Sequence, residues 1–220
     1  MNIYNKDREK QITDHNLIGF SVLFGIFVGA VTIAGVHGAK LVNIGPFVFD
    51  AGLLTISLTF LCTDIVSEVY GRSYSKKLVL GGLLGIITAM LFSKIALAAP
   101  ADLEWNLVNE YNAILGTGNR VLFAALAAYV GGQLLDITVF TWIRNKTKGK
   151  HLWLRNNLST LAGGLADAVL FSTIAFYGVY DLMPIIMSAY AIRIIISLVD
   201  TPFVYLGVYL FHKKYPELNK

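Results

Sequence analysis

The chain has 220 residues, of which 55% are hydrophobic and only 15% are charged, with a formal net charge of +4. Soluble domains carry about 25% charged residues, and the mean hydropathy of +0.62 is high, so the composition indicates a membrane protein. The single cysteine, Cys62, excludes an intramolecular disulfide.

The first 16 residues are polar, and the apolar run that follows is too long for the hydrophobic region of a signal peptide. Six apolar runs follow, each of about 20 residues or more, enough to cross a hydrocarbon core of about 30 Å. The sequence therefore predicts a single-domain, all-α, polytopic membrane protein, whose last span is tilted or broken near Pro202. The predicted spans are 17–36, 47–70, 78–99, 120–143, 158–180 and 183–211.

The basic residues of the tails and loops are distributed asymmetrically. Fourteen Lys and Arg fall in the N-terminal tail, the second and fourth loops and the C-terminal tail, whereas the other side has only Lys40 and an acidic third loop. Since Lys and Arg mark cytoplasmic loops, we expect residues 1–16 and the C-terminus to be cytoplasmic. We assign the protein to a bacterial inner membrane as a multi-pass protein, and we expect the lipid bilayer, not nucleic acid, as its partner.

The first predicted span carries small residues at about four-residue spacing, which allow two helices to approach closely. This pattern fits either internal packing or the seam of a homodimer. The small residues are Gly25, Gly29, Ala30 and Ala34.

Each of the last three spans places one aspartate in an apolar run, with a phenylalanine one turn later. Each aspartate would cost roughly 2.5–3.5 kcal/mol if it faced lipid, so all three must face protein, water or a ligand. We expect them to lie at similar depth and to line one cavity. The alternative is an internal ion pair, with Arg193, Arg120 or Lys94 as the cation and Arg193–Asp200 as the leading pair. The three pairs are Asp136 with Phe140, Asp167 with Phe171, and Asp200 with Phe203.

Asp64 and Glu68 lie four residues apart near the end of the second predicted span, and therefore share a helical face. Two acidic side chains at this place indicate a ligand site, a proton site or a cytoplasmic gate. The alternative is that they cap the basic loop 72–77.

The motifs of several enzyme classes are missing from the sequence. There is no phosphate-binding loop, no His and Cys spacing for zinc, and no nucleophile motif, and the aspartates lack the flanking residues of an intramembrane protease. We therefore expect no enzymatic activity, no cofactor and no metal site.

Residues 63–72 read Thr-Asp-Ile-Val-Ser-Glu-Val-Tyr-Gly-Arg. This string resembles the signature of the queuosine precursor transporter family, also called the vitamin uptake transporter family. The resemblance extends over about 47–210, with Gly163-Gly164 in place of a bulkier or polar pair and Arg193 in place of a lysine. Its other parts are Arg120, Ala124, Tyr129, Gln133, Asp136, Phe140, 153–157, Ser159, Thr160, Asp167, Phe171, 175–178, Thr201, Pro202 and Tyr205.

The resemblance implies an importer of 7-cyano-7-deazaguanine, 7-aminomethyl-7-deazaguanine or queuine for tRNA queuosine synthesis or salvage. Carboxylates and amides can bind the N–H donors of such a base, and aromatic rings can stack on it. We predict substrate binding by Gln133, Asp136, Phe140, Asp167, Phe171, Asp200 and Tyr205. We predict gating or proton roles for Asp64, Glu68, Arg120 and Arg193.

Three alternatives remain open at this point. The first is the substrate-binding subunit of an energy-coupling-factor vitamin transporter, which has a similar number of helices. The second is a membrane enzyme, and the third is an assembly protein, which would not need three intramembrane aspartates.

Overall fold

The computed structural model describes residues 14–37, 40–44, 47–102, 104–116, 119–178 and 181–216. Six of its helices are long and apolar enough to cross a membrane. This confirms the prediction of a helical, polytopic membrane protein. The six helices are α2 (Asp14–His37), α3 (Gly52–Val69), α4 (Arg72–Ala98), α6 (Asn119–Lys146), α7 (Leu152–Phe176) and α8 (Leu182–Lys214).

A short hairpin lies between α2 and α3. Strands β1 (Leu41–Ile44) and β2 (Phe47–Asp50) pair antiparallel, with Val42 opposite Phe49. The second predicted span was therefore wrong at its start, because α3 begins at Gly52 and not at residue 47. The aromatic and β-branched residues of 47–49 suit a strand as well as they suit a membrane helix, and hydropathy does not separate the two.

Other departures concern helix ends: α4 begins at Arg72 and α7 at Leu152, each six residues before the predicted start, and α7 ends at Phe176. The last helix also departs from the prediction. The helix α8 continues from Leu182 to Lys214 with Pro202 inside it, so the span is not broken there. A proline removes one backbone N–H donor from a helix, and the long flanking segments on both sides keep α8 in one piece. A short helix, α5 (Val108–Leu115), follows α4, and near it the rings of Trp105 and Tyr111 meet edge to face at 5.5 Å.

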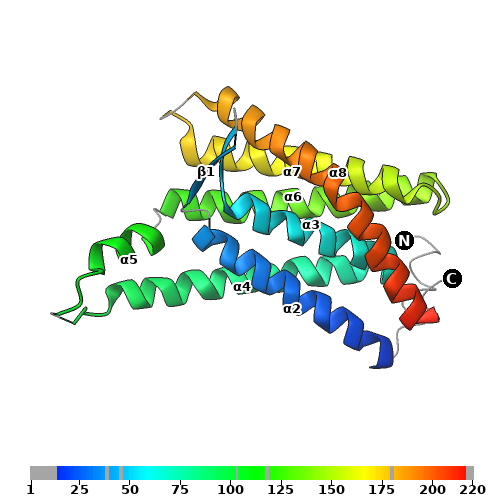
Figure 1. Ribbon diagram of the computed structural model, residues 1–220, viewed down its shortest axis with the longest axis horizontal. Coiled ribbons are helices and arrows are strands. Elements are labelled where there is room, and N and C mark those ends of the chain that lie inside the picture. Colours follow the sequence, from blue (N-terminus) through cyan, green and yellow to red (C-terminus); the bar gives the residue numbers. More distant parts are fainter. Residues whose placement is uncertain are drawn as a thin grey trace.

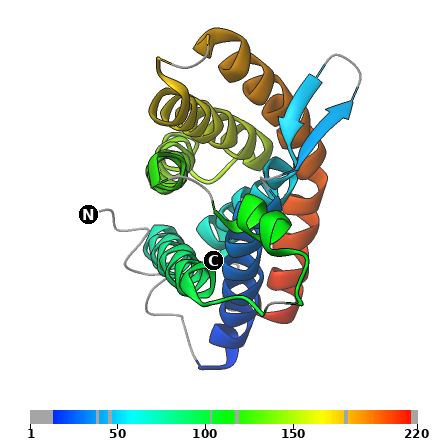
Figure 2. The same cartoon turned by 90° about the vertical axis from the view of Figure 1, so that its left-hand side faces the viewer.

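The helix α3 lies at the centre of the bundle. In its apolar segment of 18 residues, 72% of the residues are buried inside the bundle, compared with 17% in the corresponding segments of α4 and of α8. In Figure 1 the helices α6 and α7 lie on one side of α3, and α2 and α4 lie on the other, while α8 runs obliquely from the side of α7 to the end where α2 begins. Figure 2 shows α8 extending along one side of the bundle. The polar side chains of α3 are therefore covered by other helices and do not face lipid.

The connection between α3 and α4 is a tight turn that requires glycine. Gly71 has φ +86°, and the N–H groups of Tyr70 and Gly71 both donate to the carbonyl of Val66, at 2.8 and 3.0 Å. A left-handed residue at the end of a helix is usually glycine, since other side chains are strained there. This turn explains the Tyr-Gly pair of the string at 63–72.

An aromatic cluster joins three helix ends. The Tyr70 hydroxyl donates to the carbonyl of Asn16 at 2.7 Å, and the Tyr70 ring packs edge on against Phe20 and Phe211. The start of α2, the end of α3 and the end of α8 therefore lie at the same end of the bundle, as Figure 1 also shows. The N-terminal end of α2 and the C-terminal end of α8 are thus on the same side of the membrane.

The small residues of α2 do not share one environment. Ala30 and Ala34 are buried inside the bundle, whereas a Cβ atom added at Gly25 or Gly29 would meet nothing within 4 Å. Internal packing thus accounts for the two alanines. The homodimer seam stays a prediction, which concerns only the open face of Gly25 and Gly29.

Candidate functional site

Buried polar side chains from α3, α6 and α7 gather in one region of the bundle. On each helix they are spaced by one, three or four residues, so they point to one side of it. Hydrogen bonds and electrostatic contacts connect the three helices here. The group consists of Thr59, Thr63 and Asp64 on α3, Gln133 and Asp136 on α6, and Ser159 and Thr160 on α7.

Asp136 is fully buried, at 0% exposure, and both of its carboxylate oxygens are without a hydrogen-bond partner among the described residues. The hydroxyls of Thr63 and Ser159 lie nearby. Thr63, however, is directed at the carbonyls of Thr59 and Phe60, and Ser159 is directed at Asp64 and at the carbonyl of Asn156. Since buried polar atoms are nearly always paired in proteins, Asp136 marks a place where a ligand completes the structure.

Gln133 lies one turn before Asp136 and presents a second unpaired acceptor. Its amide nitrogen donates to the Thr59 hydroxyl oxygen at 2.8 Å. The Thr59 hydroxyl itself donates to the carbonyl of Ile56 at 2.6 Å, so its oxygen can only accept from Gln133. This fixes the orientation of the amide and leaves the Gln133 Oε1 atom buried without a partner. The same face of α6 therefore offers three acceptor atoms to a ligand that carries donors.

Asp64 faces this region from α3 at 1% exposure. Its two carboxylate oxygens accept hydrogen bonds from Ser159 at 3.4 Å and from Thr160 at 3.2 Å. Asp64 also lies close enough to Asp136 and Asp200 for electrostatic repulsion. The structure thus places Asp64 within electrostatic range of Asp136 and Asp200. That Asp136, Asp167 and Asp200 line one cavity at similar depth stays a prediction.

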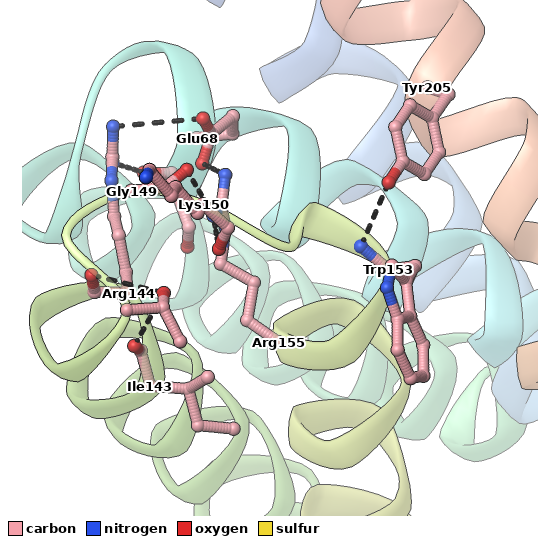
Figure 3. A network of polar contacts seen from close by, with 10 residues as sticks. Glu68, Ile143, Arg144, Gly149, Lys150, Trp153, Arg155 and Tyr205 are labelled. Atoms are coloured by element: carbon pink, nitrogen blue, oxygen red, sulfur yellow. Dashed lines mark hydrogen bonds and ion pairs between the residues drawn. The ribbon is translucent and has the colours of Figure 1, made fainter.

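Glu68 is paired with two arginines (Figure 3). Its carboxylate meets Arg155 at 2.6 Å and Arg144 at 3.7 Å, and Arg155 also donates to the carbonyls of Gly149 and Lys150, at 2.8 and 3.0 Å. These contacts favour a role between helices over the alternative that Asp64 and Glu68 cap the loop 72–77. The two arginines that pair with Glu68 come from α6 and α7. Through Arg155, Glu68 thus connects the α6–α7 loop to α3.

Asp167 forms an ion pair with Arg193 across α7 and α8. The alternative of an internal ion pair with Arg193 therefore holds for Asp167. The pair that led this alternative, Arg193–Asp200, does not form, since seven residues of one helix separate the two by about 10 Å along the axis. Arg193 instead crosses to α7 at Gly164, where an added Cβ would lie 2.9 Å from its Cδ atom. The two departures from the family pattern, a glycine on α7 and an arginine on α8, are therefore neighbours that fit one another.

The aromatic residues predicted to bind the substrate lie in different environments, although their spacing in the sequence is similar. Phe140 is fully buried, with the Arg155 guanidinium 5.5 Å from its ring centre, and Phe171 packs edge on against Phe176. Tyr205 is 44% exposed, and its hydroxyl accepts the N–H of Trp153 at the start of α7, as Figure 3 shows. Tyr205 thus satisfies a free donor of a helix end, away from the carboxylates. The side chain of Arg120 lies outside the described residues.

Sequence reasoning did not assign a role to the hydroxyl residues or to Arg155, although it noted the latter within the segment 153–157. A signal was present, because Ser159 follows Arg155 by four residues and thus shares a helical face with it. The same segment holds Asn157, whose amide donates to Thr201 at 2.8 Å and ties α7 to α8.

The close contact of α6 and α7 beside Asp136 gives a first testable prediction. A Cβ atom at Gly163 would lie 2.7 Å from the carbonyl oxygen of Gly132 and 2.8 Å from the Asp136 Cβ atom. Because backbone cannot yield as a flexible side chain does, we expect Gly163→Ala to destabilise the protein by about 1–3 kcal/mol. Gly25→Ala, in open space, is the control. Thermal unfolding in detergent measures both, and equal midpoints would contradict the close helix contact.

Six helices that are long and apolar enough to cross a membrane, arranged around a buried polar site, are typical of a multi-pass membrane transporter. The profile of the family described as "Putative vitamin uptake transporter" matches residues 50–207. The chain belongs to this family, whose members are transporters and not enzymes.

Individual relatives agree with the family match. The chain is 28% identical over 186 residues to a "Probable queuosine precursor transporter" of Bacillus subtilis, covering 82% of this chain and 81% of that protein. It is 26% identical over 157 residues to the "Queuosine precursor transporter" of Escherichia coli, covering 67% of each. A "Probable queuosine precursor transporter" of Haemophilus influenzae is 27% identical over 126 residues, covering 57% of this chain and 51% of that protein. No solved structure matches.

Proposed function

We propose that the protein imports queuosine precursors across a bacterial inner membrane, with 7-cyano-7-deazaguanine, 7-aminomethyl-7-deazaguanine or queuine as substrate. The names of its relatives support this assignment. The observation that carries the proposal is the unpaired acceptor set of Asp136 and Gln133 on α6.

The chemistry of the base matches that acceptor set. A guanine-like edge presents a ring N–H and an exocyclic amino group side by side, and a carboxylate can accept both at once. In this proposal Asp136 accepts the paired donors, and Gln133 accepts a further one. Asp167 with Arg193, and Asp200 on α8, complete the polar lining, and Phe140 and Phe171 form its aromatic part. A buried site of this kind rejects a base that lacks the donors, because its acceptors would stay unpaired.

Competition between bases tests the proposed recognition. Uptake of labelled 7-cyano-7-deazaguanine is measured in proteoliposomes that contain only this chain, with guanine or adenine as competitor. Adenine lacks the paired donor edge, so we expect it to compete at least about tenfold more weakly, the effect of 1–3 kcal/mol for unmade hydrogen bonds. Equal inhibition by adenine and guanine would contradict binding by that edge.

The same assay distinguishes a stand-alone importer from the leading alternative. A substrate-binding subunit of an energy-coupling-factor transporter binds its substrate but needs partner subunits for uptake. Uptake by the purified chain alone therefore supports the stand-alone importer, and binding without uptake supports the subunit.

The orientation of the chain is also a proposal, with both termini in the cytoplasm. It is supported by the excess of Lys and Arg on the side of the termini. A reporter fused after Lys220 is expected to be active if it requires the cytoplasm, and inactive if it requires the periplasm. Activity of the periplasmic reporter alone would contradict this orientation.

A further inference from the structure

Two buried carboxylates in the middle of the bundle are not balanced by any cationic side chain. Asp64 on α3 and Asp136 on α6 are almost completely buried, and no salt bridge involves either of them among the described residues. The nearby arginines are committed elsewhere, Arg155 to Glu68 and Arg193 to Asp167. A double negative charge in a membrane interior is costly unless a counter-charge accompanies it.

The other charged groups around the pair do not remove the imbalance. Glu68 on α3 is paired with Arg155 on α7 and Arg144 on α6, which leaves one surplus positive charge in that group. Asp200 on α8 adds a negative charge near Asp64 and offsets that surplus. The charge of Asp64 and Asp136 therefore remains to be balanced, and a bound cation or proton would balance it.

The neutral ligands around the two carboxylates are hydroxyl oxygens. Thr63, Ser159 and Thr160 border the pair, and the Thr63 hydroxyl donates to backbone carbonyls, so its oxygen can act as an acceptor. The hydroxyls of Ser159 and Thr160 lie 3.4 and 3.2 Å from the Asp64 carboxylate, close enough for their oxygens to contact the same bound cation.

We propose that Asp64 and Asp136, with these three hydroxyls, bind the monovalent cation, Na⁺ or H⁺, whose gradient drives import. The inference rests on the proposed function, because it names the energy source of the same transporter. Asp136 borders both sites, with Gln133 on the substrate side and Ser159 and Asp64 on the cation side. A bound cation lowers the cost of enclosing the two carboxylates, so the loaded and closed state that crosses between the two faces of the membrane requires it.

Proteoliposomes with imposed ion gradients test the coupling. Uptake of labelled 7-cyano-7-deazaguanine is measured with an inward Na⁺ gradient at equal pH, with an inward pH gradient without Na⁺, and with neither. For one cation per substrate, a tenfold gradient sustains accumulation of up to about tenfold, since both correspond to 1.4 kcal/mol. Accumulation with the first gradient identifies Na⁺, and accumulation with the second identifies H⁺. Equilibration without accumulation in both arms would overturn the cation site and leave the proposed function intact.

Substitutions at Asp64 and Thr160 test whether these residues couple uptake to the cation gradient. We expect Asp64→Asn to lose accumulation, down to the level seen without a gradient, and to retain exchange of labelled for unlabelled substrate, because the neutral asparagine removes the charge that the cation would otherwise balance in the closed state. Thr160→Val removes one hydroxyl at nearly constant volume and is expected to raise the ion concentration needed for half-maximal uptake. Asp102→Asn, an exposed carboxylate, is the control. Wild-type accumulation by Asp64→Asn together with an unchanged ion dependence of Thr160→Val would overturn the proposal. Absence of exchange by the wild-type protein would overturn the proposed function and this inference with it.

Discussion

Asp136→Asn is expected to abolish uptake and exchange of 7-cyano-7-deazaguanine, while the protein still inserts and folds. The change keeps the shape of the side chain but replaces one acceptor oxygen by a donor nitrogen and removes the charge. Since hydrogen bonds to charged groups contribute roughly 1.5–3 kcal/mol each, losing a bidentate contact reduces binding by about 10²-fold or more. Unlike Asp64→Asn, this variant is expected to lose exchange as well as accumulation.

The measurement compares initial uptake and exchange for the wild type, Asp136→Asn and the exposed control Asp102→Asn, with thermal unfolding to show that each is folded. Neutralising an unpaired buried carboxylate also removes an unfavourable charge, so the thermal midpoint of Asp136→Asn should be equal to that of the wild type or higher. Normal transport by Asp136→Asn would remove this residue from the binding site.

Asp167→Asn is expected to stop uptake for a partly different reason. It leaves the buried Arg193 without its carboxylate partner, and an unpaired charge is costly inside a membrane protein. The double variant Asp167→Asn/Arg193→Gln removes both charges. Recovery of stability without recovery of uptake would assign Asp167 a role in transport beyond its ion pair.

Arg155→Met is expected to produce the largest loss of stability, about 3–5 kcal/mol, as for other buried ion pairs broken on one side. Arg155 is 1% exposed, contacts Glu68 at 2.6 Å and holds the carbonyls of Gly149 and Lys150. Its removal takes away the shorter ion pair of Glu68, leaves the 3.7 Å contact to Arg144, and frees the α6–α7 loop, in which Lys148, Gly149 and His151 have positive φ.

Thermal or chemical denaturation of the protein in detergent measures this loss of stability. The double variant Glu68→Gln/Arg155→Met should recover part of it, since the buried carboxylate that lost Arg155 is then neutral, while Arg144 keeps its hydrogen bond to the carbonyl of Ser67. Lys146→Met, at an exposed position of α6, is the control and should change stability by less than about 0.5 kcal/mol. A loss as small as that of Lys146→Met would contradict the role of Arg155 as the lock between α3 and the α6–α7 loop.

The amino-acid sequence by itself determined the class of the protein and the number of its spans. Apolar runs long enough to cross a bilayer are a local property, so hydropathy located all six helices. It failed at residues 47–50, where a strand and a membrane helix have the same apolar residues. The string at 63–72 predicted the family, and the structure supplies its physical reason, with Gly71 for the turn, Tyr70 for contact with α2, and Asp64 and Glu68 for contact with α6 and α7.

Only the tertiary structure decided which charge meets which. Asp136, Asp167 and Asp200 look alike in sequence, yet Asp136 is fully buried without a partner, Asp167 is paired with Arg193, and Asp200 is half-buried on α8. Likewise, the helical spacing suggested Asp200 for Arg193, but the gap opened by Gly164 leads it to α7. Helical periodicity fixes the face of a residue on its own helix, whereas ion pairs between helices depend on rotation, depth and the volume of the residues between them.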